Sequence, residues 1–362
     1  MSICKLQKNS KLFFGSGGSE TIIAITPDKK VFKYFPIIVM LGTPKKSIND
    51  IKKEFQCEIH ILQELTKKII NKKLSPHLVK INHNYYCDEI PTSFFRKCAK
   101  YTKYLLDKHQ TPKQCNYIYR GYPHIVASGM YVCEIEYCQS SLSDVLQLVI
   151  KKNIGFIKIF LDILLFQIFF TLEIIKQSYP MFIHNDLFIR NILVGFTGKK
   201  GKYDRYIFKS KLKKYIFDVP AEYVNVKIND FGLTQLDKKT TTTYYSDYTI
   251  VHNTKRDYFN ILWDLYNGGN LGSGSLSSLT KNENKQKFIK KYFSQFMNIG
   301  TLDKIVKNDK KQHLDFDWNN TLDQQFVKLI DLSTPVQFFN YFKNIFQVDD
   351  SHEIINIYGD DV

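Results

Sequence analysis

Residues 184–193 read His184-Asn185-Asp186-Leu187-Phe188-Ile189-Arg190-Asn191-Ile192-Leu193. Its acid, Asp186, lies five residues before the amide Asn191 in an apolar frame, and Asn229-Asp230-Phe231-Gly232 follows downstream. A carboxylate can orient an attacking hydroxyl or accept its proton, and amide and carboxylate oxygens are hard ligands of the kind that Mg²⁺ prefers. The two motifs therefore predict phosphoryl transfer, with Asp186 at the acceptor hydroxyl and with Asn191 and Asp230 as metal ligands.

This ordered pair of motifs resembles the catalytic core of the protein kinase superfamily, in which H-x-D-L-x-x-x-N precedes D-F-G. The resemblance implies an α+β, bilobal fold: a small antiparallel β-sheet lobe with one main helix, and a larger, mostly helical lobe. It places the first lobe at residues 1–138, the second at residues 139–346 and a tail at residues 347–362. It also implies ATP as phosphate donor, Mg²⁺ or Mn²⁺ as the metal, and proteins as acceptors.

A glycine-rich turn precedes a lysine-bearing strand near the N-terminus. Gly15-Ser16-Gly17-Gly18 lies between the apolar runs 12–14 and 21–25, and a third predicted strand, 31–35, contains Lys33. Glycines let backbone amides approach a polyphosphate closely and Lys33 can reach its oxygens, so the pattern predicts a phosphate cradle. A plain hairpin turn is the alternative. With the hinge described below, the nucleotide-binding residues that the resemblance implies are Gly15, Gly17, Gly18, Ile22, Lys33, Glu136, Cys138 and Leu193.

A helix is predicted over residues 50–70, where apolar side chains recur at helical spacing along one face. Within it, the resemblance assigns Glu58 as the acid that pairs with Lys33. Glu54 and Glu64 are the competing acids, and Glu54, one turn earlier on a neighbouring part of the same face, is the main alternative. An isolated helix would favour a solvated glutamate, but the order of lysine, helix and catalytic loop favours Glu58.

The strand predicted at residues 131–138 ends in a sequence similar to the hinge that joins the two kinase lobes. The resemblance implies that Glu136 and Cys138 present backbone groups to adenine. An ordinary edge strand explains the same residues almost as well. Upstream, residues 88–122 are predicted to form an insertion with one helix near residues 100–108.

A long apolar segment, residues 156–178, has the length of a membrane span. Lys158, Asp162, Gln167 and Glu173 interrupt it, so no uncharged run reaches the ~20 residues that a bilayer requires. The segment is therefore predicted to be a buried helix of the larger lobe, leading into the catalytic loop. No transmembrane segment and no signal peptide are predicted.

The net charge of +16 suggests nucleic acid as a partner, but lysine carries nearly all of it. The abundance of Lys, Asn, Ile, Phe and Tyr is typical of an AT-rich coding sequence, so lysines scattered over solvated faces explain the charge better. Basic residues crowd together only at 199–214, within an extended hairpin predicted over 196–222. This basic hairpin could bind acidic protein surfaces, anionic lipid or nucleic acid, or be a solvated loop.

The composition, 44% hydrophobic and 15% aromatic residues, excludes a disordered chain, and 362 residues suffice for two lobes. The seven cysteines include no C-x-x-C pair, so they give no support for zinc and are predicted to be free thiols. Free thiols are typical of a reducing compartment, which predicts a cytoplasmic location: the host cytoplasm, or the virion for a viral protein. The sequence does not predict an oligomeric state.

Beyond Gly232, the hydroxyl-rich residues 240–245 resemble a short activation segment, although the A-P-E that normally closes it is absent. Asp257 then starts a predicted helix, and the resemblance implies that it holds the backbone of the catalytic loop. The alternative is an ordinary acid at a helix N-terminus. Further helices are predicted over 288–297, 322–332 and 335–346, and residues 349–362 are predicted to be a loose tail.

Two positions of the catalytic loop depart from the family pattern. Asn185 replaces the arginine that answers a phosphorylated activation segment, which predicts activity without that switch. Phe188 replaces the lysine used on the transferred phosphate. Arg190, placed where tyrosine kinases of the family can carry an arginine, could supply the missing charge. The alternatives are that Arg190 pairs with an acid of the activation segment or points to solvent.

The sequence thus predicts a serine/threonine-protein kinase, and two other classes remain open. A small-molecule phosphotransferase of the aminoglycoside or choline type shares H-N-D-L-x-x-x-N but usually lacks an intact glycine loop and the Phe-Gly after the metal aspartate. A pseudokinase scaffold has no need to keep Lys33, Glu58, Asp186, Asn191 and Asp230 together. The basic hairpin, short activation segment and AT-rich composition resemble kinases of large cytoplasmic DNA viruses.

Overall fold

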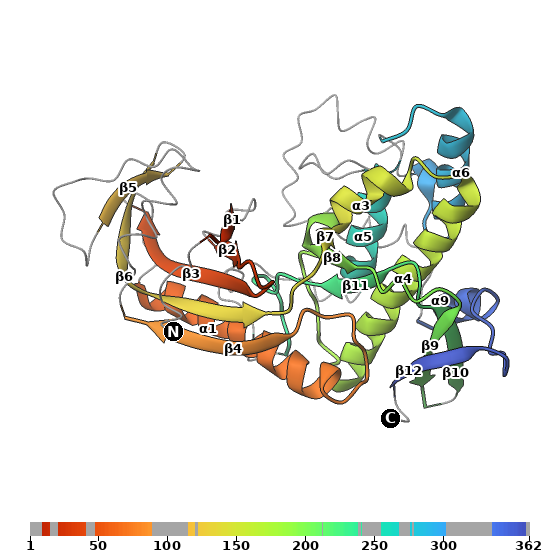
Figure 1. Cartoon of the computed structure of the whole chain (residues 1–362), viewed down its shortest axis with the longest axis horizontal. Helices are drawn as coiled ribbons and strands as arrows, with labels where there is room; N and C mark the ends of the chain where they lie inside the picture. Colours follow the sequence, from red (N-terminus) through yellow and green to blue (C-terminus); the bar gives the residue numbers. More distant parts are fainter. Residues whose placement is uncertain are drawn as a thin grey trace. The chain divides into compact units, whose positions relative to one another are not determined.

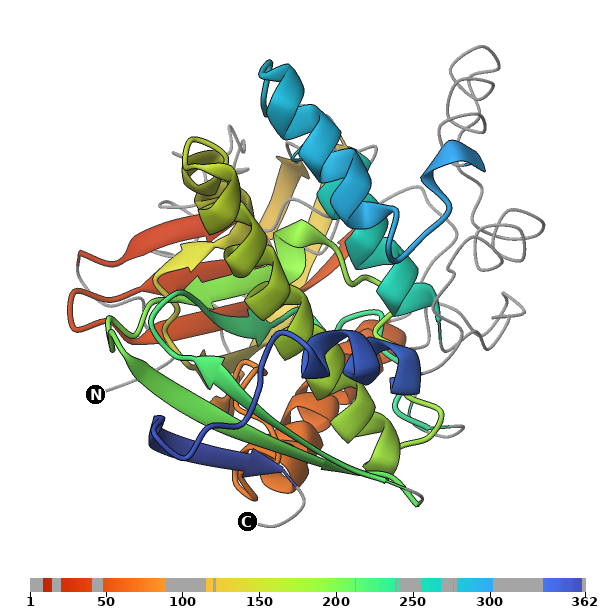
Figure 2. The ribbon, with the colours of Figure 1, turned by 90° about the vertical axis from the view of Figure 1, so that its right-hand side faces the viewer.

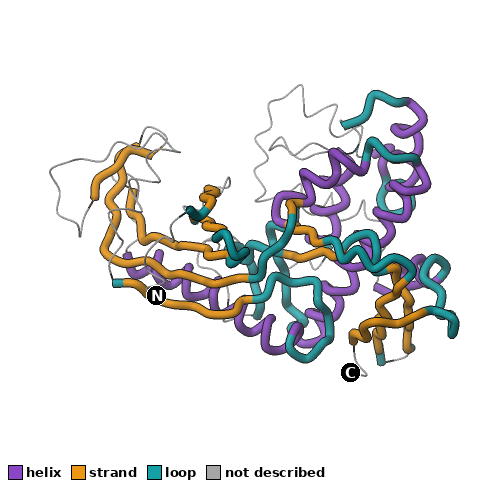
Figure 3. The backbone as a smooth tube through the Cα atoms, viewed as in Figure 1, coloured by secondary structure: helices purple, strands orange, loops and turns teal. Residues whose placement is uncertain are grey.

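The computed structural model divides the chain into two compact units (Figure 1). Unit 1 consists mainly of residues 1–63 and 79–137, and unit 2 mainly of residues 64–78 and 138–362. Strands predominate in unit 1 and helices in unit 2 (Figure 3). The structure describes residues 9–14, 21–40, 48–88, 115–119, 122–211, 213–237, 240, 255–267, 276, 279–301 and 335–359.

Unit 1 is built on an antiparallel sheet in the order β1-β2-β3-β6-β4, with β5 paired to β6. Hydrogen bonds between Thr26 and Lys30 close the tight turn from β2 to β3. Because β3 lies between β2 and β6, Lys33 on β3 faces Ile23 on one side and Cys133 on the other. The strands are β1 (Lys11–Phe14), β2 (Ile22–Ile25), β3 (Val31–Met40), β4 (Ile81–Cys87), β5 (Cys115–Tyr119) and β6 (Tyr122–Ile135).

Helix α1 (Ile48–Leu65) lies between β3 and β4 in the chain, and it continues into a π-helical turn, η1 (Thr66–Ile70). The predicted helix over residues 50–70 is therefore confirmed. Its apolar face is buried through Ile59, Leu62 and Leu65. The fold class is confirmed as well: an α+β chain with an antiparallel sheet near its N-terminus and helices in its later part.

Unit 2 is organised around α4 (Ile154–Ser178), the long apolar helix. Its length and composition would allow it to cross a membrane, but most of it is buried inside the protein. Its buried polar side chains are hydrogen-bonded: Asp162 accepts from the Tyr292 hydroxyl at 2.8 Å, and Gln167 accepts from the backbone N–H of Val226 at 2.9 Å. Buried polar groups with partners are what a core helix of a folded domain requires, as predicted.

Unit 2 also contains a small sheet, ordered β11-β8-β7, and its strand β8 directly follows the loop at residues 184–191. In it, β8 (Ile192–Gly195) pairs antiparallel with β11 (Asn225–Ile228) and with β7 (Ser140–Ser141). The remaining helical elements are α3 (Leu142–Val149), the 3₁₀ turn η2 (Ile189–Asn191), α5 (Arg256–Asn267), α6 (Glu283–Phe293) and α9 (Pro335–Lys343).

The predicted basic hairpin is present as β9 (Lys202–Lys209) and β10 (Lys214–Pro220), paired antiparallel. The expectation of a loose tail is wrong, because β12 (Glu353–Gly359) pairs in parallel with β9. Side-chain contacts reinforce this pairing: Asn356 donates to Asp204 at 2.7 Å, and the His352 ring stacks on Tyr203 at 3.7 Å. The tail sequence Glu-Ile-Ile-Asn-Ile-Tyr-Gly is too short to identify a strand whose partner lies far away in the sequence.

The hairpin is also a core element. Its strands lie beside α4 and α9 (Figure 2), and the side chains that contact these helices are aromatic. Phe217 meets Phe166 of α4 edge-on at 4.9 Å, and Phe208 lies 4.5 Å from Phe339 of α9. Arg205, counted among the basic residues, makes a bidentate pair with the buried carboxylate of Asp218. The reading of this segment as a solvated loop therefore fails for its inner face.

The prediction of free thiols is wrong for Cys87, which is disulfide-bonded, and holds for Cys57, Cys133 and Cys138. The sequence spacing alone could not reveal a pair that only folding brings together. Helix α6 starts at Glu283, before the predicted residue 288, because the Asn282 side chain caps it by accepting from the Lys285 N–H at 3.1 Å. The helices predicted over 100–108 and 322–332 lie outside the described residues.

Candidate active site

The catalytic loop of unit 2 holds Asp186 through its own amide. The Asn191 side chain donates from Nδ2 to the backbone oxygen of Asp186 at 2.7 Å and to its Oδ2 at 2.6 Å. The turn η2 brings these residues together, with the Asn191 N–H donating to Phe188 O at 2.9 Å. The five-residue spacing read from the sequence is thus the spacing that folds the amide back onto the acid.

Two buried aspartates of α5 hold the backbone of this loop. Asp257, 1% exposed, accepts from the N–H groups of His184 at 2.7 Å and Asn185 at 3.0 Å, which is the contact expected from the sequence. Asp264 accepts from the Ile189 N–H at 2.7 Å. Sequence reasoning missed Asp264, although it lies seven residues after Asp257 and therefore on the same helical face.

Asp230 is placed next to this loop by the pairing of β8 with β11. Ile192 pairs with Ile228, so the residues just outside the pair also meet, and the Asn229 N–H donates to Asn191 O at 2.9 Å. Asp230 itself has a φ of 65°, in the left-handed region that aspartate tolerates better than most residues. Of the two predicted metal ligands, Asn191 is therefore bonded through its backbone to the residue just before Asp230.

The donor set fits a magnesium ion held jointly with phosphate oxygens. The Asn191 amide directs its Nδ2 at Asp186, which leaves Oδ1 as the atom that can bind a cation. Among the residues that the structure describes, no cluster of three His, Cys, Asp or Glu side chains is placed to hold a metal. Mg²⁺ does not require such a cluster, because it is usually bound by one or two protein oxygens together with substrate phosphates and water.

Arg190 contacts Asp186 rather than either of the partners weighed from the sequence. Its Nη2 donates to Asp186 Oδ1, and its guanidinium lies 4.7 Å from the centre of the Phe188 ring. Both side chains of the ion pair are largely shielded, with Arg190 27% and Asp186 14% exposed. The aromatic residue that replaces the usual lysine therefore supports a cation that lies beside Asp186.

In unit 1, Lys33 and Glu58 form a buried ion pair. Lys33 Nζ lies 2.6 Å from Glu58 Oε1, and the two side chains are only 5% and 7% exposed. This is the partner that the sequence favoured over Glu54. Glu64 accepts a hydrogen bond from Tyr179 at 2.8 Å instead. Burial, followed by the charge of Glu58, raises the pKa of the neighbouring Cys133 thiol to about 12, so this cysteine stays protonated at neutral pH.

The predicted nucleotide-binding residues are placed in part. Strand β6 ends just before Glu136, whose N–H donates to Lys80 O at 2.9 Å, and Cys138 is a free thiol. Ile22 is buried at the start of β2, and Leu193 is half-buried on β8. Gly15, Gly17 and Gly18 lie outside the described residues, as do residues 241–245 of the activation segment.

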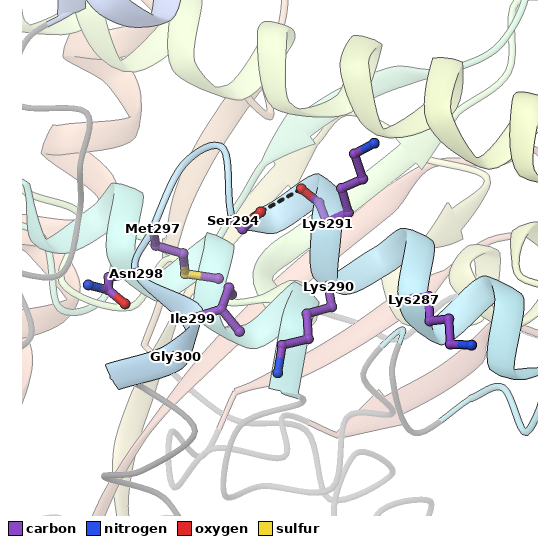
Figure 4. Close-up of a pocket in the computed structure, with 8 residues that line it drawn as sticks. All are labelled: Lys287, Lys290, Lys291, Ser294, Met297, Asn298, Ile299 and Gly300. Atoms are coloured by element: carbon purple, nitrogen blue, oxygen red, sulfur yellow. Dashed lines mark hydrogen bonds between the residues drawn. The ribbon is translucent and has the colours of Figure 1, made fainter.

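A separate pocket of about 510 Å³ lies at the C-terminal end of α6 (Figure 4). Lys287 and Lys290 project from the helix, and Met297 and Ile299 supply its apolar part. None of its lining residues is a predicted site residue. The pocket therefore does not belong to the catalytic arrangement.

Comparison with known proteins agrees with the family that these motifs indicate. No family model matches the chain. A protein of Acanthamoeba polyphaga mimivirus, named "Putative serine/threonine-protein kinase", is 32% identical over 320 residues, which cover 81% of this chain and 78% of that relative. A second mimivirus protein with the same descriptive name is 25% identical over 202 residues, or 54% of this chain and 41% of that protein. The chain therefore belongs to the protein kinase superfamily, among the kinase-like proteins of giant viruses.

Proposed function

We propose that the protein transfers the γ-phosphate of ATP to serine and threonine hydroxyls of protein substrates, with Mg²⁺, or Mn²⁺ in its place. The observation that carries this proposal is the arrangement around Asp186, which is oriented by Asn191 and Arg190 on a loop fixed by Asp257. The names of the mimivirus relatives support the kinase assignment and the choice of protein acceptors.

The residues of the proposed site would have different roles, according to the chemistry of their side chains. Asp186 would orient the acceptor hydroxyl and take its proton, since Arg190 and Asn191 hold it in place while each carboxylate oxygen keeps lone pairs to accept with. Lys33, braced by Glu58, would contact the phosphates of ATP. Asn191 and Asp230 would hold the metal ion, which when bound neutralises charge on the phosphate oxygens.

Phosphoamino-acid analysis tests the acceptor class. Casein labelled by the protein from γ-labelled ATP should yield phosphoserine and phosphothreonine after acid hydrolysis. Label confined to phosphotyrosine would contradict the proposal, and would instead connect Arg190 with the tyrosine kinases that carry an arginine at this place.

Removing the Arg190 charge should slow transfer without weakening ATP binding. Developing charge on the transferred group needs a cation near Asp186, and loss of one such donor costs about 10²-fold in turnover. We expect Arg190→Ala to show this loss and Arg190→Lys to recover part of it, with the affinity for ATP little changed. Steady-state rates with casein, together with nucleotide titrations, measure both quantities. Near-normal turnover in Arg190→Ala would show that another cation serves the phosphate.

The protein should be active without phosphorylation of its activation segment. Asn185, which stands in place of the usual arginine, donates from Nδ2 to Leu233 O at 2.9 Å and so ties the catalytic loop directly to the residue after Asp-Phe-Gly. Because this hydrogen bond joins two neutral groups, it does not require a phosphate group on the activation segment. Protein treated with phosphatase and then washed should keep most of its initial rate. The idea fails if phosphatase abolishes that rate and replacement of residues 240–243 does the same.

A further inference from the structure

The segment 71–78, here called the α1 loop, ends the helix that carries Glu58. Helix α1 and the turn η1 are continuous, and the last backbone hydrogen bonds run from Asn71 N to Thr66 O and from Leu74 N to Ile69 O, both at 2.9 Å. A helix whose end is fixed cannot easily shift along its axis or rotate about it. The α1 loop therefore fixes the last turns of this helix, residues 64–70, which belong to unit 2 as the loop does.

Hydrogen bonds join the α1 loop to several other segments of unit 2. Ser75 Oγ lies 2.7 Å from Thr171 Oγ1 of α4, and Lys227 Nζ donates to Pro76 O at 2.7 Å. The Ile228 N–H donates to His77 O at 2.9 Å, and the Gly359 N–H at the end of β12 donates to Lys73 O at 3.1 Å. Two of these contacts come from β11, the strand that leads directly into Asp230.

His77 is the centre of this anchoring. It is 1% exposed, and burial together with the charge of Lys227 lowers its pKa to about 3, so the ring is neutral near pH 7. A neutral imidazole has one N–H donor and one acceptor. Nδ1 faces the backbone oxygen of Val226 at 3.1 Å and must carry the proton, so Nε2, 2.8 Å from the Tyr206 hydroxyl, accepts from it.

Tyr206 comes from the basic hairpin, the segment inserted between Asn191 and Asp230. It is fully buried on β9, where its ring stacks on His77 at 5.6 Å and meets Phe166 and Phe170 of α4 edge-on at 5.2 and 5.1 Å. Its hydroxyl is the donor that the neutral His77 ring requires. The inner face of the hairpin thus reaches the α1 loop as well as the core.

We infer that Tyr206 is a positioning residue for phosphoryl transfer, which acts through His77. It would hold the α1 loop against β11, and thereby fix the end of the Glu58 helix relative to the strand that delivers Asp230. This inference rests on the proposed kinase function. It assigns the hairpin an internal bracing role, in addition to whatever its outer lysines bind.

The chain offers a matched pair of variants for the test. Tyr206→Phe removes only the hydroxyl that donates to His77. Tyr215→Phe makes the same change on β10 of the same hairpin, where the buried Tyr215 hydroxyl has no hydrogen-bond partner among the described residues. Both rings remain in place, so both variants should fold, and melting temperatures check this.

Two readouts separate bracing from general stability. We expect Tyr206→Phe to raise hydrogen exchange of the amides of residues 71–78 about tenfold, because a buried acceptor loses its donor. Turnover should fall about tenfold, with the KM for casein within about twofold of wild type. Tyr215→Phe should change neither. Equal behaviour of the two variants, or a Tyr206→Phe protein identical to wild type, would overturn the inference.

The exchange measurement needs no activity, which keeps the two proposals distinguishable. A wild-type protein that transfers no phosphate would overturn the proposed function and the kinetic part of the inference. Hydrogen exchange would still decide whether Tyr206 holds the α1 loop. Conversely, an active protein with unchanged exchange in Tyr206→Phe would leave the kinase proposal intact and remove the brace.

Discussion

Replacing Asp186 with asparagine should lower the rate of phosphoryl transfer by about 10³-fold or more, while ATP binding largely survives. An amide cannot take the proton of the acceptor hydroxyl, and positioned acid–base groups contribute up to about 10⁴-fold to such reactions. ATP affinity should be maintained because the substitution leaves Lys33 and the proposed metal ligands, Asn191 and Asp230, unchanged. Steady-state transfer to casein and nucleotide titration measure the two quantities.

The matched control for this variant is Asp144→Asn, the same change at the start of α3, where the acid accepts from Ser141 at the exposed surface. It should leave transfer unchanged. If Asp186→Asn retained the wild-type rate, Asp186 would not be the group that acts on the acceptor, and the loop geometry would need another explanation.

The second large effect should come from Glu58→Gln, with Glu54→Gln as its control. Neutralising Glu58 leaves the Lys33 ammonium, 5% exposed, without its carboxylate, and breaking a buried pair in this way costs about 3–5 kcal/mol. The misplaced lysine should also cost about 10²–10³-fold in turnover, as expected when one charge-stabilising donor is lost. Glu54→Gln should change neither quantity by much, because Glu58 is the acid in contact with Lys33.

Chemical denaturation and transfer assays on both variants measure these effects. A Glu54→Gln protein that loses activity while Glu58→Gln keeps it would mean that the ion pair changes partner in the working protein. Similar, small effects in both would show that the Lys33–Glu58 pair is structural and does not serve the phosphates.

Short-range spacing explains why much of the site was predictable. Asn191 follows Asp186 by five residues, and the 3₁₀ turn η2 within this short separation brings the amide to the acid. The order of Lys33, the helix and the loop was enough to choose Glu58. The contact of Asp257 with His184 and Asn185 followed from the family pattern, because that acid lies in the first turn of helix α5.

Long-range pairing explains what the sequence did not reveal. His77 and Tyr206 are 129 residues apart, and β12 pairs with a strand about as far from it in the sequence. Neither partner marks the other by composition or spacing. Arg190 was singled out from the sequence as a cation, but the motif does not reveal that its guanidinium contacts Asp186 and lies 4.7 Å from the centre of the Phe188 ring.

The basic hairpin is part of the core although its sequence is rich in lysine. Its lysines suggested a docking surface or a solvated loop, yet Tyr206, Phe208, Tyr215 and Phe217 form buried aromatic positions on the same two strands. Their spacing of two residues is the period of a strand with one buried face. The alternation is visible in the sequence, but the prediction for this segment was based on its many basic residues.

A panel of acceptors shows whether the protein transfers phosphate from ATP to other proteins. Purified protein is incubated with γ-labelled ATP and Mg²⁺ in the presence of casein, basic protein, choline or an aminoglycoside, with and without EDTA. We predict label in the protein acceptors alone, and its loss when EDTA removes the metal. Label in choline or the aminoglycoside but not in protein, or no label in any acceptor, would contradict the account.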